Sequence, residues 1–244
     1  MVLNQPDPNP AETGSAAEAE PAEAGEVSHN VLGQKLGRKG RQTRERILAV
    51  AADLIAEEAP LSLSAVARRV PLGMTSLYNY FSDLTELFLA VLDPVMATAE
   101  EAYVAQLRSR WPDETLGETC YAFARGVFDF WSRNARLLHL RNAMADSGDI
   151  RVRTYRIKGS QDIIRLMAAQ MDPGPFDRTS PAAGMATVLV TAIERTATVA
   201  TNAGLTTLFG PDMAFPADHY LKPGARILEM AIRDMRAQLA AAQG

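Results

Sequence analysis

Pro71 divides one apolar-periodic segment, residues 61–81, into two short stretches. Proline lacks an amide N–H and disfavours the helical conformation of the residue before it, so a helix must end here. Four apolar residues before it recur at the spacings of one helical face: Leu63, Val66, Ala67 and Val70. After Gly73, the inward face of a second helix is predicted to hold Met74, Leu77 and Phe81. The segment therefore predicts two short helices joined by a tight turn.

The second helix is expected to expose a polar face. Its outward residues are small hydroxyls, an amide and two phenols: Thr75, Ser76, Tyr78, Asn79 and Tyr80. Such groups suit the DNA major groove, where hydroxyls and amides read base edges and tyrosines contact phosphates or thymine methyls. A cluster of six basic residues precedes the segment: Lys35, Arg38, Lys39, Arg41, Arg44 and Arg46. The basic cluster and the polar helix face together predict an arm and a helical unit that bind double-stranded DNA.

Charge is segregated along the chain. The net charge is -4, but the first 34 residues contain six acidic side chains and no Lys or Arg, which leaves +2 on the rest. Residues 35–81 carry eight basic and four acidic side chains, as expected of a phosphate-binding surface. Residues 1–34 are rich in Ala, Glu, Pro and Gly and are predicted to form a disordered acidic tail.

At residues 41–92 the chain resembles the tetracycline-repressor (TetR) family of transcriptional regulators. The motif that carries the resemblance consists of a hydroxyl cap at Ser62, the Val66-Ala67 pair and the ending Leu77-Tyr78-Asn79-Tyr80-Phe81. The chain departs from the family pattern at the turn, which contains Pro71, at Tyr80 in place of a histidine, and at Leu84 in place of a lysine.

The resemblance implies a homodimeric repressor that binds a palindromic DNA operator and is released by a small, largely apolar effector. Together with helix phase, it assigns phosphate contacts to Arg41, Arg44, Arg68 and Tyr78. Base edges are assigned to Thr75, Ser76, Asn79 and Tyr80. Thr43, in the first turn of the first helix, and Ser62 complete the predicted DNA-binding set.

The remaining sequence is helical by its periodicity, and we expect an all-α chain of about nine helices without a sheet. The domains expected are a tail at 1–34, a basic arm with a three-helix helix-turn-helix unit at 35–82, and a helical ligand-binding and dimerisation domain at 83–244. Helices are predicted at about 41–58, 83–108, 115–132, 134–146, 149–171, 181–204 and 224–242, in addition to the two short ones.

Two regions of the larger domain have expected roles. Aromatic and Met residues at helical spacing, with a few polar groups, are typical of an adaptable apolar pocket. The predicted ligand-binding residues are Phe123, Val127, Trp131, His139, Arg141, Met144, Tyr155 and Met167. The small residues of helix 181–204, together with helix 224–242, predict the dimer interface, although the same pattern also fits packing within one chain.

Other function classes find little support in the sequence. The three histidines are isolated, and there is no glycine-rich phosphate loop or nucleophile elbow, so we expect no enzyme, metal or cofactor. A single cysteine and no long apolar run indicate a cytoplasmic protein outside the membrane. Two rivals stay open: a helical ligand-binding or scaffold protein with a degenerate DNA-binding head, and a nonspecific architectural DNA binder that uses the arm alone.

Overall fold

The computed structural model describes residues 29–30, 33–202, 204, 207–208, 210 and 215–243. These residues contain no β-strand, and an isolated bridge pairs His29 with Lys35 before the first helix. The predicted all-α class is confirmed. In chain order the elements are α1 (Arg38–Ala56), α2 (Leu63–Arg69), α3 (Met74–Tyr78), α4 (Leu84–Ala97), α5 (Ala99–Ala102), the 3-10 turn η1 (Val104–Leu107), α6 (Leu116–Arg133), α7 (Ala135–Asp146), α8 (Ile150–Met171), α9 (Pro181–Ala200) and α11 (Ala217–Gln243).

Most of the acidic tail predicted over 1–34, namely 1–28 and 31–32, lies outside the described residues. At its end, Asn30 and Gln34 close a small loop, in which the Gln34 amide donates to the Asn30 side chain over 2.8 Å. Helix α1 then begins at Arg38, three residues earlier than the sequence predicts.

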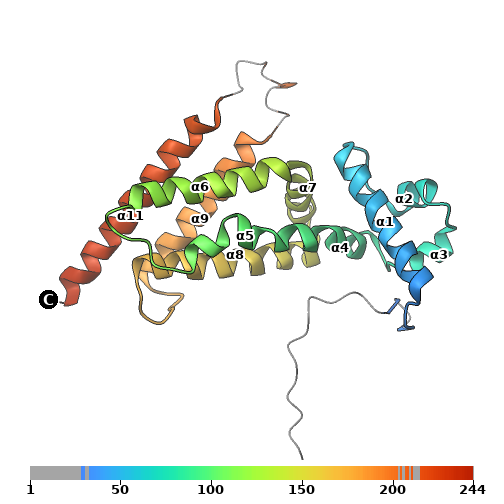
Figure 1. Cartoon of the computed structure of the whole chain (residues 1–244), viewed down its shortest axis with the longest axis horizontal. Helices are drawn as coiled ribbons and strands as arrows, with labels where there is room; N and C mark the ends of the chain where they lie inside the picture. Colours follow the sequence, from blue (N-terminus) through green and yellow to red (C-terminus); the bar gives the residue numbers. More distant parts are fainter. Residues whose placement is uncertain are drawn as a thin grey trace, which may run out of the picture.

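Helices α1, α2 and α3 form a compact unit, called the head below, at one end of the molecule (Figure 1). Its interior is closed by fully buried apolar side chains: Ile47, Val66, Leu77 and Phe81. The Ser62 hydroxyl accepts the Ala65 amide over 3.1 Å and so caps α2, as the sequence predicts. Met74 was expected to face inward, and this is wrong: it is 37% exposed, because α3 spans only five residues and Leu77 alone anchors it.

Helix α4 links the head to the remaining helices, called the body. Two hydrogen bonds cap its first turn. The Asp83 carboxylate accepts the Glu86 amide over 2.8 Å, and the Glu86 carboxylate accepts the Ser82 amide. A single helix from 83 to about 108 was expected, and the structure corrects this. The helix contains Pro94 but continues past it to Ala97, where α5 and η1 replace it.

The junction between α5 and η1 packs against α6. A Cβ at Gly126 would come within 2.7 Å of the Ala102 carbonyl oxygen and 3.1 Å of the Tyr103 Cβ, so only glycine lets α6 pack this tightly against the chain between α5 and η1. The turn there directs Tyr103 toward α6, where its ring lies edge-on to Phe123 and Phe130 at centroid distances of 6.1 and 5.5 Å.

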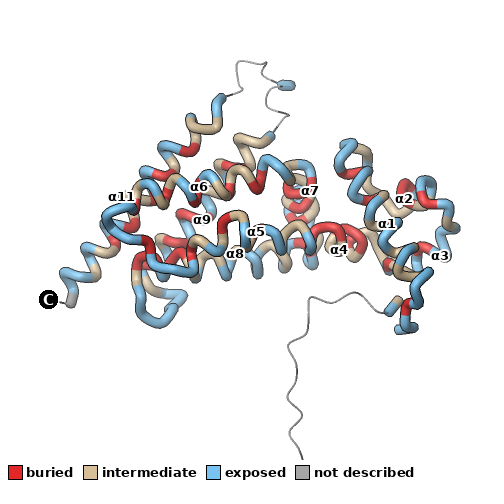
Figure 2. The backbone as a smooth tube through the Cα atoms, viewed as in Figure 1, coloured by how far each residue is buried: buried red, intermediate tan, exposed pale blue. Residues whose placement is uncertain are grey.

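The body packs α6, α8, α9 and α11 around one core that is continuous with the head (Figures 1 and 2). Helix α11 begins at Ala217, seven residues before the predicted start, and passes through Pro223. Pro223 lies past the first turn of α11 and removes one backbone hydrogen bond there, while Leu221, only 4% exposed, holds the added turns against the core. Among the described residues, no helix is long and apolar enough to cross a membrane.

Candidate nucleic-acid interface and ligand cavity

Helix α3 presents a polar face to solvent. Thr75, Ser76, Tyr78 and Asn79 are all exposed, while Leu77 between them is fully buried (Figure 2). The Leu72 amide donates to the Val70 carbonyl over 2.6 Å, which makes the turn around Pro71 tight and brings α3 close to α2. Four of the predicted base-reading and phosphate-contacting residues therefore share one exposed surface.

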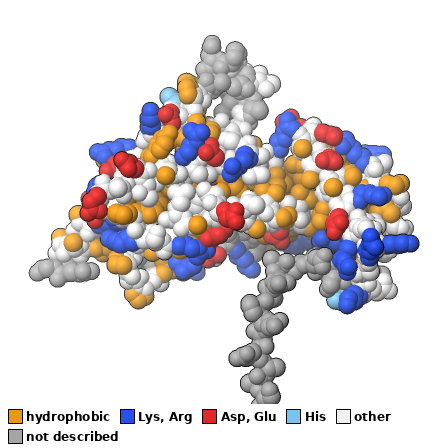
Figure 3. Space-filling model, viewed as in Figure 1, with side chains coloured by type: hydrophobic (Ala, Val, Ile, Leu, Met, Phe, Trp, Pro, Cys, Tyr) orange, Lys and Arg blue, Asp and Glu red, His pale blue; other side chains and the backbone are white. Residues whose placement is uncertain are grey.

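Basic side chains surround this face. Lys35, Arg38, Lys39, Arg46 and Arg68 are exposed, and Figure 3 shows Lys and Arg gathered on the end of the head where α1 begins and α3 lies. Such a surface attracts a polyanion, and the exposed guanidinium of an arginine can pair with a phosphate in two hydrogen bonds.

Three predicted DNA-contacting residues also have structural roles within the head. The Arg44 guanidinium lies over the Phe81 ring, 5.1 Å from its centroid, and burial there lowers its pKa against the opposing effect of Glu86. Arg41 donates to the Leu36 carbonyl over 3.1 Å, and Thr43 donates to the Lys39 carbonyl over 3.0 Å. Each is half-buried, so these side chains brace the start of α1 as well as adding charge or polarity to its surface.

Tyr80 and Ser62 lie apart from the α3 face. Tyr80 follows α3 and is half-buried against the core, and the Ser62 hydroxyl is engaged in capping α2. Arg69, next to Arg68, forms a two-bond ion pair with Glu57 at 2.9 and 2.5 Å, which leaves Arg68 as the freer cation of α2.

A cavity of about 650 Å³ lies inside the body. Its apolar wall comes from α6, α8 and α9, and includes Phe123, Val127, Phe130, Trp131, Ile163, Leu166, Val190 and Ile193. The volume falls in the range of small-molecule sites.

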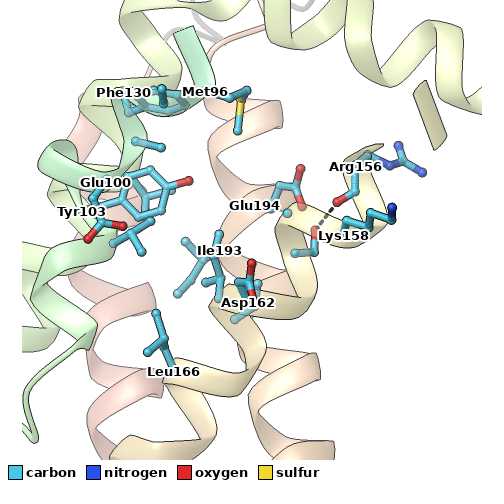
Figure 4. Close-up of a pocket in the computed structure, with 18 of the residues that line it drawn as sticks. Met96, Glu100, Tyr103, Phe130, Arg156, Lys158, Asp162, Leu166, Ile193 and Glu194 are labelled. Atoms are coloured by element: carbon cyan, nitrogen blue, oxygen red, sulfur yellow. Dashed lines mark hydrogen bonds between the residues drawn. The ribbon is translucent and has the colours of Figure 1, made fainter. Parts of the chain in front are cut away.

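Tyr103 contributes a polar group to the cavity. Although the residue is only 5% exposed, its hydroxyl points into the open space (Figure 4). No described residue bonds to this hydroxyl, and every fully buried side-chain donor of the described residues has a partner, so the hydroxyl is accessible from the cavity. Burial raises the pKa of Tyr103 to about 12, an effect that Arg141 opposes and Glu194 reinforces. The phenol therefore remains protonated and able to donate at neutral pH.

The buried Arg141 and the partly exposed Glu194 form an ion pair on the cavity wall. The Arg141 Nη2 lies 2.5 Å from Glu194 Oε1, and the guanidinium stacks over the Trp131 ring at 5.4 Å from the centroid. Its Nε and Nη2 also donate to Asn142 at 3.2 and 3.0 Å. Its Nη1 faces only the Met96 sulfur, at 4.0 Å, which is a weak acceptor.

No protein-family model matches the chain, and no curated protein matches it in sequence. Solved structures match it in fold. A transcriptional regulator from Rhodococcus sp. Rha1 superposes with a TM-score of 0.54 at 20% sequence identity, covering 79% of this chain and 95% of that one. A transcriptional regulator of the TetR/AcrR family from Thermobifida fusca YX-ER1 gives a TM-score of 0.50 at 19% identity, covering 77% of this chain and 97% of that one. This chain has the TetR/AcrR fold.

In this TetR/AcrR fold, five of the eight predicted ligand-binding residues line the cavity: Phe123, Val127, Trp131, Arg141 and Tyr155. The other three do not line it. His139 bonds to Thr201 over 3.2 Å and lies edge-on to Trp131, while Met144 and Met167 pack into the core. The helical periodicity placed these three residues on the inner faces of their helices. It does not distinguish a side chain that fills the core from one that borders the cavity.

Several cavity residues were missing from the predicted set, among them Tyr103, Glu194 and Met96. Glu194 had a detectable signal, because it and Arg195 are the charged residues of the otherwise apolar or small-residue helix α9. Tyr103 had none, since the helix break that turns it inward depends on the packing of α6.

Polar contacts also join the start of α4, next to the head, to the start of α8 in the body, and we call these two contacts the latch. The Thr85 hydroxyl, in a residue only 7% exposed, donates to the Asp149 carboxylate, and Arg151 pairs with Asp83 at 2.8 Å. The hydrogen bond from Thr85 is the main cause that lowers the pKa of Asp149, and the one from Arg151 does the same for Asp83. Both carboxylates therefore stay ionised at neutral pH.

Proposed function

We propose that this chain is a sequence-specific DNA-binding transcriptional regulator of the TetR/AcrR type. The observation that carries the proposal is the exposed polar face of α3, which is anchored by the fully buried Leu77 and surrounded by exposed basic side chains. The likeness in fold to a TetR/AcrR regulator supports it.

Roles can be divided by position. Thr75, Ser76 and Asn79 read base edges, since they lie on the exposed face of a short helix and offer the donors and acceptors that bases match. Arg68 and Tyr78 hold phosphates, with Arg41, Arg44 and the first turn around Thr43 adding contacts from α1. Tyr80 approaches the groove from the end of α3, and Ser62 positions α2.

Selection from random duplexes tests the proposal. An enriched palindrome is the expected result, whereas uniform binding would indicate an architectural DNA binder and no binding a scaffold protein. Asn79→Ala should cost about 1–3 kcal/mol on the selected site and relax specificity there. Arg68→Ala should weaken specific and random DNA alike and reduce the salt slope by about 1. Equal, uniform losses in both variants would refute this division of roles.

The dimer we propose uses α9 and α11, which pack against each other. Three large apolar side chains remain exposed on them: Val188 at 64%, Ile227 at 58% and Met230 at 56%. Burial of such residues against a second copy would place two heads on the two halves of a palindrome, about one helical turn apart.

Sedimentation equilibrium tests this interface. The wild-type chain is expected at twice the monomer mass of 26.5 kDa. Met230→Glu should shift the population toward monomer, because it places a charge in an apolar contact. Ile157→Glu is the matched control, since Ile157 is 48% exposed and belongs to α8 rather than to the two helices of the proposed interface. A wild-type monomer, or equal dissociation of both variants, would contradict the interface.

The cavity is proposed to bind the effector that releases the operator. Helix α4 carries Asp93 and Met96 at the cavity and Thr85 at the latch, and α8 carries Tyr155 at the cavity and Asp149 at the latch. A ligand that separates α4 from α8 would therefore also move the head. Release follows if the ligand favours a head position that does not fit the operator, as a shift between two populations.

A further inference from the structure

The charged side chains around the cavity largely neutralise one another. Glu100 makes two bonds with Arg108, at 2.5 and 2.8 Å, and Arg141 pairs with Glu194. Arg156 of α8 also lines the cavity, and it pairs at 3.1 Å with Asp146, which does not. Figure 4 shows the Arg156 and Lys158 side chains directed away from the side of the cavity that Tyr103 and Ile193 border. On the side that Tyr103 and Arg141 border, an ionic ligand would therefore meet charges that are already paired.

Two donors on this wall lack a strong acceptor among the described residues. One is the Tyr103 hydroxyl, which opens onto the cavity, and the other is Nη1 of Arg141, which reaches the Met96 sulfur at 4.0 Å. A purely apolar ligand would remove water from both donors without replacing its hydrogen bonds, which costs binding free energy. A ligand that carries a hydrogen-bond acceptor would replace the hydrogen bonds that the displaced water made.

The nature of the acceptor follows from the ion pair. Glu194 already compensates the charge of Arg141, so a carboxylate ligand would compete with Glu194 and add negative charge beside Asp93 and Glu100. An ammonium ligand offers no acceptor to either donor. A carbonyl oxygen has two lone pairs and no net charge, and can accept from both donors at once.

We propose that the cavity binds a neutral, mostly apolar molecule whose carbonyl oxygen accepts hydrogen bonds from the Tyr103 hydroxyl and Nη1 of Arg141. This inference rests on the proposed function, because it names the chemical class of the effector of that same cavity. The aromatic walls around Phe123, Phe130 and Trp131 favour a flat apolar body.

Four probes on one skeleton test the proposal by isothermal titration calorimetry on the full chain: 2-acetylnaphthalene, 2-ethylnaphthalene, 2-naphthoate and 1-(2-naphthyl)ethylamine. The ketone is expected to bind tightest. Binding that is equal for ketone and hydrocarbon, tighter for the acid or the amine, or undetectable for all four would overturn the proposal.

Tyr103→Phe removes only the hydroxyl. It should weaken the affinity for the ketone by about three- to tenfold, the equivalent of one net hydrogen bond, and leave the affinity for the hydrocarbon unchanged. Tyr121→Phe is the control, because the Tyr121 hydroxyl donates to Asp218 over 2.6 Å and does not line the cavity. The ratio of ketone to hydrocarbon affinity separates a lost contact from a loosened fold, and an unchanged ratio in Tyr103→Phe would refute the assignment.

The selected duplex distinguishes this inference from the proposed function. If the chain binds a palindrome but does not prefer the ketone, the chemical class is wrong while the DNA-binding function stands. If the ketone binds in a Tyr103-dependent manner but no duplex is enriched, the DNA-binding function is wrong while the chemical class of the ligand stands.

Discussion

Removing the Thr85 hydroxyl by Thr85→Val tests whether the latch holds the head on the body. The substitution nearly preserves shape, and it deletes the donor to the Asp149 carboxylate. A hydrogen bond to a charged group contributes about 1.5–3 kcal/mol. Asp149 is partly exposed and keeps two backbone donors, Arg151 and Val152, at 3.0 and 3.1 Å, so we expect a loss of about 1–2 kcal/mol.

Urea denaturation and thermal melting measure the effect. For a chain of this size, 1 kcal/mol corresponds to about 2–4 °C in Tm. Thr119→Val is the matched control, because the Thr119 hydroxyl bonds only to the Thr115 carbonyl within the first turn of α6, at 3.0 Å, and it should change little.

The pH dependence of the effect has a definite sign. The pKa of Asp149 is lowered in the folded state, so its stabilising contribution is present above its ordinary pKa and is lost as the pH falls through the folded value. The stability difference between the wild type and Thr85→Val should therefore be constant near neutral pH and narrow below about pH 4.

A double-mutant cycle completes the test. In an Asp149→Asn background, Thr85→Val should cost about 1 kcal/mol less than in the wild type, because the charged acceptor is already gone. An unchanged cost in that background, or an equal loss in Thr119→Val, would refute the view that this hydrogen bond stabilises the latch.

Three further predictions concern single residues. Leu77→Ala should cost about 2–5 kcal/mol and abolish DNA binding with loss of head structure in thermal melts, since Leu77 alone anchors α3; a wild-type Tm would contradict this. Ser62→Ala should lower stability by about 1 kcal/mol in urea denaturation and Ser62→Gly by only a few tenths, as for a helix cap, and equal losses would argue against capping. Burial raises the pKa of Cys120 to about 12, so the native thiol should not react with Ellman's reagent at pH 8, whereas the unfolded chain should titrate at one thiol, and rapid native labelling would disprove the burial.

The elements of the head could be predicted because their signals are local. Proline at position 71 must end a helix, Ser62 has the chemistry of a cap, and the spacing of Phe81 from Leu77 marks one buried side. The length of α3 could not be predicted from local signals. The helix has only five residues, which leaves its first apolar side chain, Met74, at the surface.

The body was less predictable where its geometry depends on distant contacts. Helix α4 passes Pro94 and ends at Ala97, and farther along the chain Gly126 of α6 allows a close approach at Ala102 and Tyr103. The same contact turns Tyr103 into the cavity. Sequence periodicity identified the apolar helix faces, yet which of those side chains border open space depends on how four helices are spaced, and no single segment encodes that.

The Arg141–Glu194 pair limits how the cavity can be redesigned for other ligands. Replacing Glu194 alone leaves the buried Arg141 charge without its partner, which costs up to about 3–5 kcal/mol, whereas replacing both with apolar side chains of similar volume is close to neutral for stability. Mutant libraries that vary positions 141 and 194 together should thus yield folded biosensor variants that single-site scanning discards.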